Sequence, residues 1–239
     1  MKFSQLFRIY VNQPLNKNQT ISLAGERQHY LSSVIRLKIT EQIRVFNEQD
    51  GEFIAQVKLI NKKEITLTVL DSFRSVVSEP GFVLALCIIK LDRFLEAIRA
   101  AVQIGVTEII PIISSRVQIK KVPREKIENI LQQSTEQSER FKVPILAKET
   151  SLEDLMRRHD IEQIIFANEN EMESKIIANI DDWKDNLCVL VGPEGGFTDQ
   201  ETTLLDNSKI TSVSLGRTVM RSEVAAIVAL GCIKIMRKK

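Results

Sequence analysis

The segment that most limits how this chain can fold is an apolar run that leads into a glycine-rich turn and then a helix. Residues 189–191 are purely apolar, and Gly192-Pro193-Glu194-Gly195-Gly196 follows at once. Thr198 and Glu201 stand at capping-box spacing, which predicts a helix start. Glycines let backbone N–H groups approach a ligand, and open α/β sheets bind ligands at the carboxyl ends of their strands. A plain change of chain direction is the alternative interpretation.

A second segment near the C-terminus has a similar organisation. We expect a short strand at 212–215 and an apolar helix from Val224 to about Met236. Arg221 and Glu223 stand at the entrance to this helix, where charged side chains are costly to bury unless they are paired or used. A structural salt bridge between them is one interpretation, and a functional site is the other.

Composition excludes several classes of protein. The chain has 239 residues, 44% of them hydrophobic, which is enough for one large domain or two smaller ones. The three cysteines lie among apolar neighbours without a CxxC spacing, and there are two histidines, so we expect no disulfide and no metal site. The first residues lack a signal-peptide pattern, and the apolar run 82–89 is too short to cross a membrane. We therefore expect a cytoplasmic protein with no membrane contact.

The charges are unevenly distributed although the net charge is only +2. Residues 84–127 are mainly basic, 149–206 are strongly acidic, and 207–239 are basic again. Such a chain can present a positive face to the phosphates of a nucleic acid. The alternative is that these charges only solvate helix faces.

Two sequence patterns divide the chain. The first seventy residues predict a β domain with a hairpin turn at Asp50-Gly51 and a short helix over 26–37. Its strands are expected at 6–11, 43–46, 53–60 and 64–69. Residues 72–81 are typical of a linker.

After the linker, apolar strands alternate with helices. Strands are expected at 82–89, 108–113, 164–167, 187–191 and 212–215. One helix is expected to begin with Asp92 as its cap and to end before Gly105, and another runs from Pro123 to about Arg140. The alternation implies a parallel sheet with helices on both faces.

Several blocks together resemble one known family, the RsmE-type ribosomal-RNA uridine methyltransferases of the SPOUT superfamily. The two signature loops are Gly192-Pro193-Glu194-Gly195-Gly196-Phe197 and Leu215-Gly216 with Met220-Arg221-Ser222-Glu223-Val224-Ala225. Glu136-Gln137-Ser138-Glu139-Arg140 with Val143-Pro144 is similar to a further block, and His29 with Val34-Ile35-Arg36 to an N-terminal motif. The resemblance covers nearly the whole chain.

The resemblance implies a fold and an activity. It implies a PUA-like RNA-binding β-barrel over 1–71, a linker over 72–81 and a SPOUT α/β domain over 82–239, with a trefoil knot at about 164–236. It also implies a homodimer that binds S-adenosyl-L-methionine and methylates ring nitrogen 3 of one uridine in 16S ribosomal RNA, within the small subunit or its precursor.

The chemistry of such a reaction assigns roles to the loop residues. Uridine nitrogen becomes a good nucleophile once its proton leaves, and a guanidinium beside the ring oxygens stabilises the developing charge. Arg221 is the candidate for this role, and Glu223 either orients Arg221 or accepts the proton. The expected cofactor contacts are Phe166, Asn168, Leu190, Gly192, Gly195, Gly196, Leu215, Gly216 and Met220. Leu190 and Leu215 are equally expected in the core of any such fold.

The expected RNA contacts are Arg36, Arg116, Lys120, Arg124 and Arg140, each with a solvated or salt-bridged surface residue as the alternative. Two other functions stay open at this point. One is a related SPOUT enzyme that methylates a ribose hydroxyl of transfer RNA. The other is a catalytically silent RNA-binding assembly factor of the ribosome.

Overall fold

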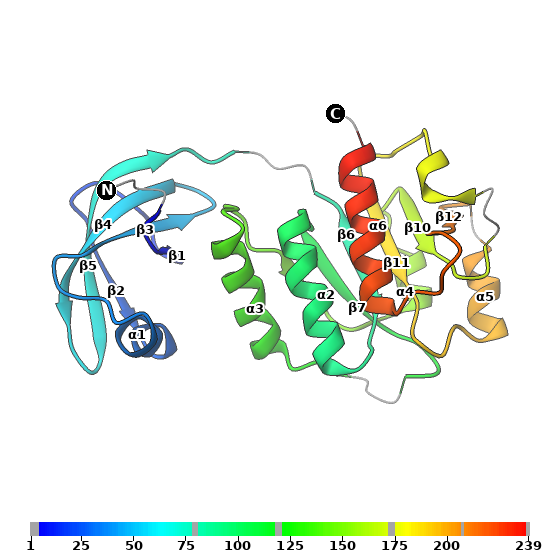
Figure 1. Ribbon diagram of the computed structural model, residues 1–239, viewed down its shortest axis with the longest axis horizontal. Coiled ribbons are helices and arrows are strands. Elements are labelled where there is room, and N and C mark those ends of the chain that lie inside the picture. Colours follow the sequence, from blue (N-terminus) through cyan, green and yellow to red (C-terminus); the bar gives the residue numbers. More distant parts are fainter. Residues whose placement is uncertain (1–4, 78–80, 118–120, 172–174, 207, 238–239) are drawn as a thin grey trace. The chain divides into compact units, whose positions relative to one another are not determined.

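The computed structural model describes residues 5–77, 81–117, 121–171, 175–206 and 208–237 (Figure 1). Backbone contacts divide the chain into two compact units. Unit 1 comprises residues 1–78 and 135–143, and unit 2 comprises 79–134 and 144–239. Residues 78–80 of the expected linker lie outside the described residues.

Unit 1 contains a curled sheet of five strands in the order β1-β3-β4-β5-β2. The strands are β1 (Arg8–Tyr10), β2 (Thr20–Ala24), β3 (Gln42–Asn47), β4 (Gly51–Ile60) and β5 (Glu64–Arg74). β1 is parallel to β3, and the other pairs are antiparallel. β1 and β2 are the two edges, so the described part of the sheet is a half-barrel and the expected barrel does not close.

The turn between β3 and β4 depends on Gly51. Its φ is 93°, and a Cβ there would lie 2.6 Å from the carbonyl oxygen of Arg74. The hairpin predicted at Asp50-Gly51 is therefore confirmed. β5 continues to Arg74, beyond the expected start of the linker, because it still pairs with β4 through Glu52.

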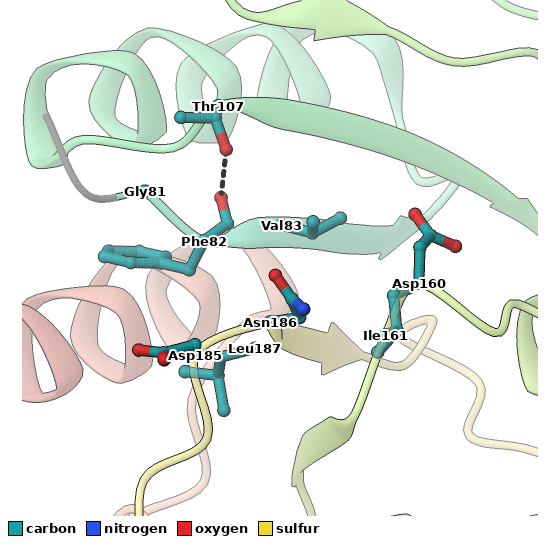
Figure 2. Close-up of a pocket in the computed structure, with 9 residues that line it drawn as sticks. All are labelled: Gly81, Phe82, Val83, Thr107, Asp160, Ile161, Asp185, Asn186 and Leu187. Carbon is teal, nitrogen blue, oxygen red and sulfur yellow. Dashed lines mark hydrogen bonds between the residues drawn. The ribbon is translucent and has the colours of Figure 1, made fainter. Parts of the chain in front are cut away.

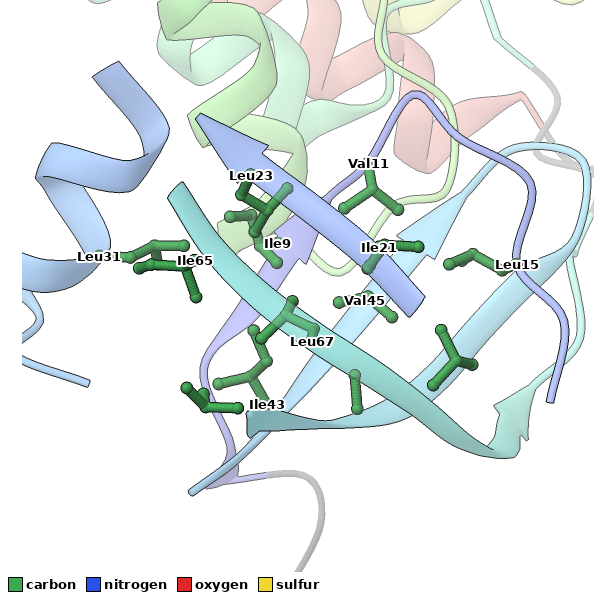
Figure 3. Packing of buried hydrophobic residues seen from close by; sticks show 13 residues of the cluster. Ile9, Val11, Leu15, Ile21, Leu23, Leu31, Ile43, Val45, Ile65 and Leu67 are labelled. Carbon is green, nitrogen blue, oxygen red and sulfur yellow. The ribbon is translucent and has the colours of Figure 1, made fainter. Parts of the chain in front are cut away.

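The core of unit 1 follows the two-residue period of its strands. In β5, Ile65, Leu67 and Val69 are fully buried, and the residues between them are half-exposed. Figure 3 shows Ile65 and Leu67 in one cluster with Ile21 of β2 and Val45 of β3. Burying each aliphatic side chain of this size contributes about 1.5–3 kcal/mol.

The helix predicted over 26–37 is wrong as a single helix. The chain forms α1 (Glu26–His29) and then a π-helical turn, η2 (Tyr30–Val34). The amide of Ile35 donates to the carbonyl of Tyr30 at 3.0 Å, five residues back, and Arg36 ends the turn with a φ of 59°. Only Leu31 of η2 is buried, so little packing favours a longer regular helix.

A buried carboxylate, Glu52, organises the charges of unit 1. Glu52 is fully buried and pairs with Arg8 at 3.2 Å, Arg44 at 3.1 Å and Arg74 at 2.6 Å. Arg44 and Arg74 also reach Glu139, at 2.9 and 2.8 Å. Burial lowers the pKa of Arg8 to about 10, against the opposing effect of Glu52, so its guanidinium stays charged at neutral pH.

Residues 135–143 belong to unit 1 although they lie far along the chain. The Arg8 guanidinium donates to the carbonyls of Thr135 at 3.3 Å and Arg140 at 2.9 Å. The amide of Tyr10 donates to Glu136 Oε1 at 3.0 Å, and Phe141 packs edge-on against Phe46. Buried hydrogen bonds and an aromatic contact therefore hold this segment.

Unit 2 contains the predicted parallel sheet, in the order β12-β10-β11-β6-β7-β8, with β9 on β7. The strands are β6 (Val83–Cys87), β7 (Glu108–Ile113), β8 (Ile145–Leu146), β9 (Thr150–Ser151), β10 (Gln163–Ala167), β11 (Leu187–Val191) and β12 (Ile210–Val213). The helices are α2 (Leu91–Ile104), α3 (Arg124–Gln137), α4 (Leu152–Met156), the 3-10 turn η4 (Ile177–Asn179), α5 (Asp199–Leu205) and α6 (Ser222–Met236). All described strand pairs of this sheet are parallel.

Both faces of this sheet are buried. Ala85 and Ile110 pack into a cluster with Leu152 and Leu155 of α4. Their strand neighbours Leu84 and Ile109 point to the opposite face and are equally buried. α2 and α6 pack on each other, and α6 also packs on β10 and β11. None of the described helices is long and apolar enough to cross a membrane.

The C-terminal end of α2 agrees with the sequence prediction, whereas its N-cap differs from it. Gly105 follows the helix with a φ of 124°, as predicted. The N-cap is Lys90 and not Asp92, because the amide of Phe94 already bonds the Lys90 carbonyl at 2.9 Å. Asp92 lies in the first turn, where its charge favours the helix dipole.

Candidate functional site

The strand order of unit 2 brings three predicted loops to one edge. β10 lies between β11 and β12, with Ala167 in register with Val191 and Val213. The loops after these residues therefore begin side by side at the carboxyl edge of the sheet. They carry Asn168, the glycine loop (residues 192–197) and the segment 214–221.

The glycine loop has the backbone geometry that the sequence suggested. The amide of Gly196 donates to the Pro193 carbonyl at 2.9 Å, and Gly196 has a φ of 67°. A Cβ on Gly192 would lie 3.0 Å from Phe197 Cε2, so a larger residue would displace that ring. Both arms of the predicted capping box between Thr198 and Glu201 are present.

Glu201 does more than cap α5. Its Oε2 accepts from the amide of Thr198 at 2.9 Å, and its Oε1 accepts from the amide of Ser115, after β7, at 2.7 Å. Burial alone would raise the pKa of Glu201, but these hydrogen bonds outweigh it and lower the pKa below its ordinary 4.5. The ionised carboxylate thus ties the glycine loop to the end of β7.

The other two loops are joined to their neighbours by hydrogen bonds. Asn168 donates from its amide to the Val213 carbonyl at 2.9 Å and from Nδ2 to Ser212 Oγ at 3.1 Å. Gly216, with a φ of 119°, donates to Ser214 Oγ at 3.2 Å. Ser222 Oγ, at the start of α6, donates to the Gly192 carbonyl at 2.8 Å.

The expected cofactor residues differ in burial. Leu190 is fully buried and Phe166 is 9% exposed, and Phe166 packs against Phe197 with ring centroids 5.7 Å apart. Leu190 and Phe166 are therefore core residues of the strands from which the loops begin. For Leu190 this agrees with its interpretation as a core residue. Leu215 and Met220 are half-buried beside the loops and remain expected contacts.

Arg221 and Glu223 do not form the salt bridge that was one interpretation of the sequence. Arg221 is exposed at the N-cap of α6, whereas Glu223, in the first turn, is 4% exposed. Glu223 Oε1 lies 3.9 Å from Nε of Arg93, and the buried Glu223 Oε2 has no hydrogen-bond partner among the described residues. An exposed cation and a buried carboxylate thus stand two residues apart in the chain, at the edge of the sheet.

Sequence reasoning did not find Arg93. It lies in the first turn of α2, and its Nη1 pairs with Glu194 of the glycine loop. A cation at a helix N-terminus interacts unfavourably with the helix dipole. This unfavourable position was the signal in the sequence by which Arg93 could have been found.

The expected RNA contacts are dispersed over both units. Arg36 is exposed on unit 1, and Arg116 is exposed and donates to the Gly195 carbonyl. Arg124 donates to the carbonyls of Leu146 and Ala147, both at 2.8 Å. Arg140 is only 5% exposed, which weighs against a surface role. Lys120 lies outside the described residues.

Two cavities in the described part of unit 2 lie at opposite edges of the sheet. One, of about 210 Å³, is at the amino ends of β6 and β11, opposite the glycine loop, with Phe82, Thr107 and Asp185 on its walls (Figure 2). The other, of about 330 Å³, lies between Ile89, Phe94 and Val122 and is mostly apolar. The described residues contain no cluster of His, Cys, Asp and Glu able to hold a metal ion.

Comparisons with family models show the class of protein to which this chain belongs. A family model described as an RNA methyltransferase domain matches residues 78–234, and one described as an RNA methyltransferase PUA domain matches residues 23–70. The fold and the carboxyl-edge loops are thus those of an RNA methyltransferase with a PUA domain.

Individual relatives narrow this to one family. Ribosomal RNA small subunit methyltransferase E of Rickettsia conorii is 37% identical over 96% of this chain and 95% of its own length. The protein of that name from Bacillus subtilis is 25% identical over 92% of both chains. The chain belongs to the family of ribosomal RNA small subunit methyltransferase E.

Solved structures of similar proteins have the same fold as this chain. A Legionella pneumophila methyltransferase in complex with its cofactor S-adenosylmethionine has a TM-score of 0.87 at 26% identity, over 97% of this chain and 98% of the other. A Neisseria gonorrhoeae ribosomal RNA small subunit methyltransferase E has a TM-score of 0.85 at 24% identity and supports the fold. These findings support the ribosomal RNA methyltransferase over the two alternatives, the transfer RNA ribose methyltransferase and the catalytically silent assembly factor.

We predict that Glu201→Gln destabilises the protein at neutral pH by about 1–3 kcal/mol, because glutamine keeps only one acceptor oxygen and its remaining hydrogen bonds lose their charge. The folded-state pKa of Glu201 is lowered, so its contribution is complete above the unfolded pKa, about 4.3, and is lost as pH falls through the folded value. Urea unfolding from pH 7 to pH 3 should show the difference in stability between the two proteins shrinking as pH falls below the unfolded pKa of Glu201.

The matched control is Asp199→Asn, an exposed acid in the first turn of the same helix. It should cost less than about 1 kcal/mol. Equal stability of Glu201→Gln and the parent protein at pH 7 would contradict the prediction.

Proposed function

We propose that this protein uses S-adenosyl-L-methionine to methylate nitrogen 3 of a uridine in 16S ribosomal RNA. The observation that carries the proposal is the set of three adjoining loops at the carboxyl edge of the parallel sheet. They hold the glycine loop, an exposed arginine and a buried carboxylate within a chain of this family. A cytoplasmic location follows from the substrate.

The glycine loop fits the cofactor. Gly192 has no room for a Cβ without moving Phe197, and Gly196 has a positive φ, so the loop offers backbone to a ligand and no side chain. Gly195 and Gly216 extend this surface, and Asn168 borders it from β10. The bound cofactor supplies a methyl group on a sulfonium, which is already activated for transfer.

Arg221 has the placement of an electrostatic catalyst. Its side chain is exposed, while its backbone is fixed because its carbonyl accepts from the Ala225 amide at 2.8 Å. A uracil ring placed at this edge would present its carbonyl oxygens to the guanidinium. The planar donor would then stabilise the charge that develops as N3 loses its proton.

Glu223 is the proposed proton acceptor. Its Oε2 is buried without a hydrogen-bond partner among the described residues, and a donor such as the N3–H of uridine would satisfy it. The proton of N3 passes to this oxygen, and the freed nitrogen electron pair forms the new N–CH₃ bond as the S–CH₃ bond breaks. Arg221 and Glu223 thus act on different atoms of one ring.

We predict that Arg221→Ala lowers kcat by about 10²–10³-fold while leaving cofactor affinity and Tm nearly unchanged. The Arg221 side chain has no hydrogen-bond or ion-pair partner among the described residues, and its effect arises when charge develops on the ring. Arg221→Lys should recover only part of the activity, because an ammonium lacks the planar two-pronged geometry. Methyl transfer to 16S RNA and calorimetry with S-adenosylmethionine measure both effects.

The control for Arg221 is Arg217→Ala in the same loop, which should retain most of the activity. Near-normal turnover of Arg221→Ala would remove Arg221 from the mechanism. Loss of Tm in the same variant would assign it a structural role.

Unit 1 supplies an RNA-binding surface. Arg36 is exposed between two exposed apolar side chains, Val34 at 61% and Ile39 at 53%, an arrangement suited to a phosphate beside an unstacked base. Arg116 is the corresponding candidate in unit 2.

We predict that Arg36→Gln weakens RNA binding and reduces the slope of log Kd against log salt by about one unit. Lys17→Gln is the matched control, since Lys17 is exposed on unit 1 but pairs with Asp71 at 2.5 Å. An unchanged salt slope in Arg36→Gln would return Arg36 to the solvated surface.

A homodimer through α6 is part of the proposal. One face of α6 is buried, whereas Val224 is 42% and Ile235 is 79% exposed, which leaves apolar surface uncovered. We predict a dimeric mass in sedimentation at micromolar concentration, and a monomeric mass after Ile235→Glu. A wild-type monomer at that concentration would contradict the dimer.

The expected trefoil knot at about 164–236 also stays a proposal. It is supported by the return of the chain after β12, which places Ser222 beside Gly192. An experimental backbone traced from end to end would test it.

A further inference from the structure

Arg93 occupies a position that local rules disfavour. It lies in the first turn of α2, where the helix dipole places partial positive charge. Its side chain is 25% exposed, so water does not fully solvate it. A cation in this place needs compensation from nearby carboxylates.

Two carboxylates, one in the glycine loop and one at the start of α6, supply that compensation. Arg93 Nη1 pairs with Glu194 Oε1 in the glycine loop. Arg93 Nε lies 3.9 Å from Glu223 Oε1 at the start of α6. One guanidinium therefore stands between the loop proposed to hold the cofactor and the acid proposed to take the proton.

The burial of the two acids differs. The side chain of Glu194 is 38% exposed, whereas that of Glu223 is 5% exposed. For Glu223, the Arg93 guanidinium is the cation that forms its ion pair, and it leaves Oε2 without a partner among the described residues. A buried carboxylate stays ionised only when a cation or donors compensate for the lost water.

We infer that Arg93 is a positioning residue for methyl transfer, which holds Glu223 in place and links it to the glycine loop through Glu194. This inference rests on the proposed function. Arg93 does not touch the reacting atoms in this assignment. It pairs with Oε1 of Glu223 and leaves Oε2 without a partner among the described residues, and it anchors the glycine loop at the same time.

The two contacts of Arg93, with Glu194 and with Glu223, lead to separate predictions. Arg93→Gln removes the cation beside Glu223 and should lower kcat about tenfold or more, the usual effect of losing a charge-assisted interaction. It should also weaken S-adenosylmethionine affinity, because the loop loses its anchor. Glu194→Gln should weaken cofactor affinity while leaving kcat at saturation near normal. This division between affinity and kcat is one that a general loss of folding would not produce.

Arg93→Lys tests the geometry. An ammonium can pair with one carboxylate but does not present two separate faces as a guanidinium does. The lysine variant should therefore recover only part of what Arg93→Gln loses. Arg99→Gln, an exposed arginine on the same helix, is the matched control and should behave as wild type.

The experiment measures kcat with 16S RNA, cofactor affinity by calorimetry, and Tm for each variant and for the double variant Arg93→Gln with Glu194→Gln. The double variant should bind cofactor no more weakly than Arg93→Gln alone, since the shared contact is already lost. Wild-type kcat in Arg93→Gln, or a loss of kcat fully explained by unfolding, would overturn the inference. Failure of the proposed function would show instead in the wild-type protein, as absence of methyl transfer to uridine.

Discussion

The parallel register of β12, β10, β11 and β6 is the constraint on which the site of unit 2 depends. Each pair runs in the same direction, so every strand ends at one edge and begins at the other. Loops separated by many residues, such as those after Ala167, Val191 and Val213, are thereby brought together at one edge of the sheet. Ser222 and Arg93 then fix the loops more closely. The apolar strands provide the position, and the polar links provide the geometry.

Buried carboxylates have opposite uses in the two units. Glu52 in unit 1 is surrounded by three guanidinium groups, which is the arrangement of a structural ion cluster. Glu223 in unit 2 is similarly buried but has one cation, Arg93, with Nε 3.9 Å from Oε1, and an oxygen without a partner among the described residues. A fold gains nothing from leaving a buried acid in that condition, whereas a proton acceptor requires it. The contrast is our physical reason for assigning chemistry to Glu223.

The sequence predicted the elements whose signals are local and strong. The bounds of β7 and β11, the capping box of Thr198 and Glu201, and the parallel sheet are confirmed. β2 was missed because its alternation contains only two buried residues, Ile21 and Leu23. The attachment of residues 135–143 to unit 1 was also beyond reach, since it depends on Arg8 binding carbonyls more than a hundred residues away. Periodicity reports which face is buried, and not which distant segment covers it.

The residues of the candidate site also differ in whether local sequence signals could identify them. Glycines and charges at strand ends could be recognised because each violates a local expectation in an apolar context. Arg93 violates one too, as a cation at the start of a helix, but one residue of that kind is common on protein surfaces. Its meaning required the positions of Glu194, in the glycine loop, and Glu223, in the first turn of α6. Local conflicts that are resolved only by tertiary partners tend to mark functional sites, because selection for stability alone would remove the conflict.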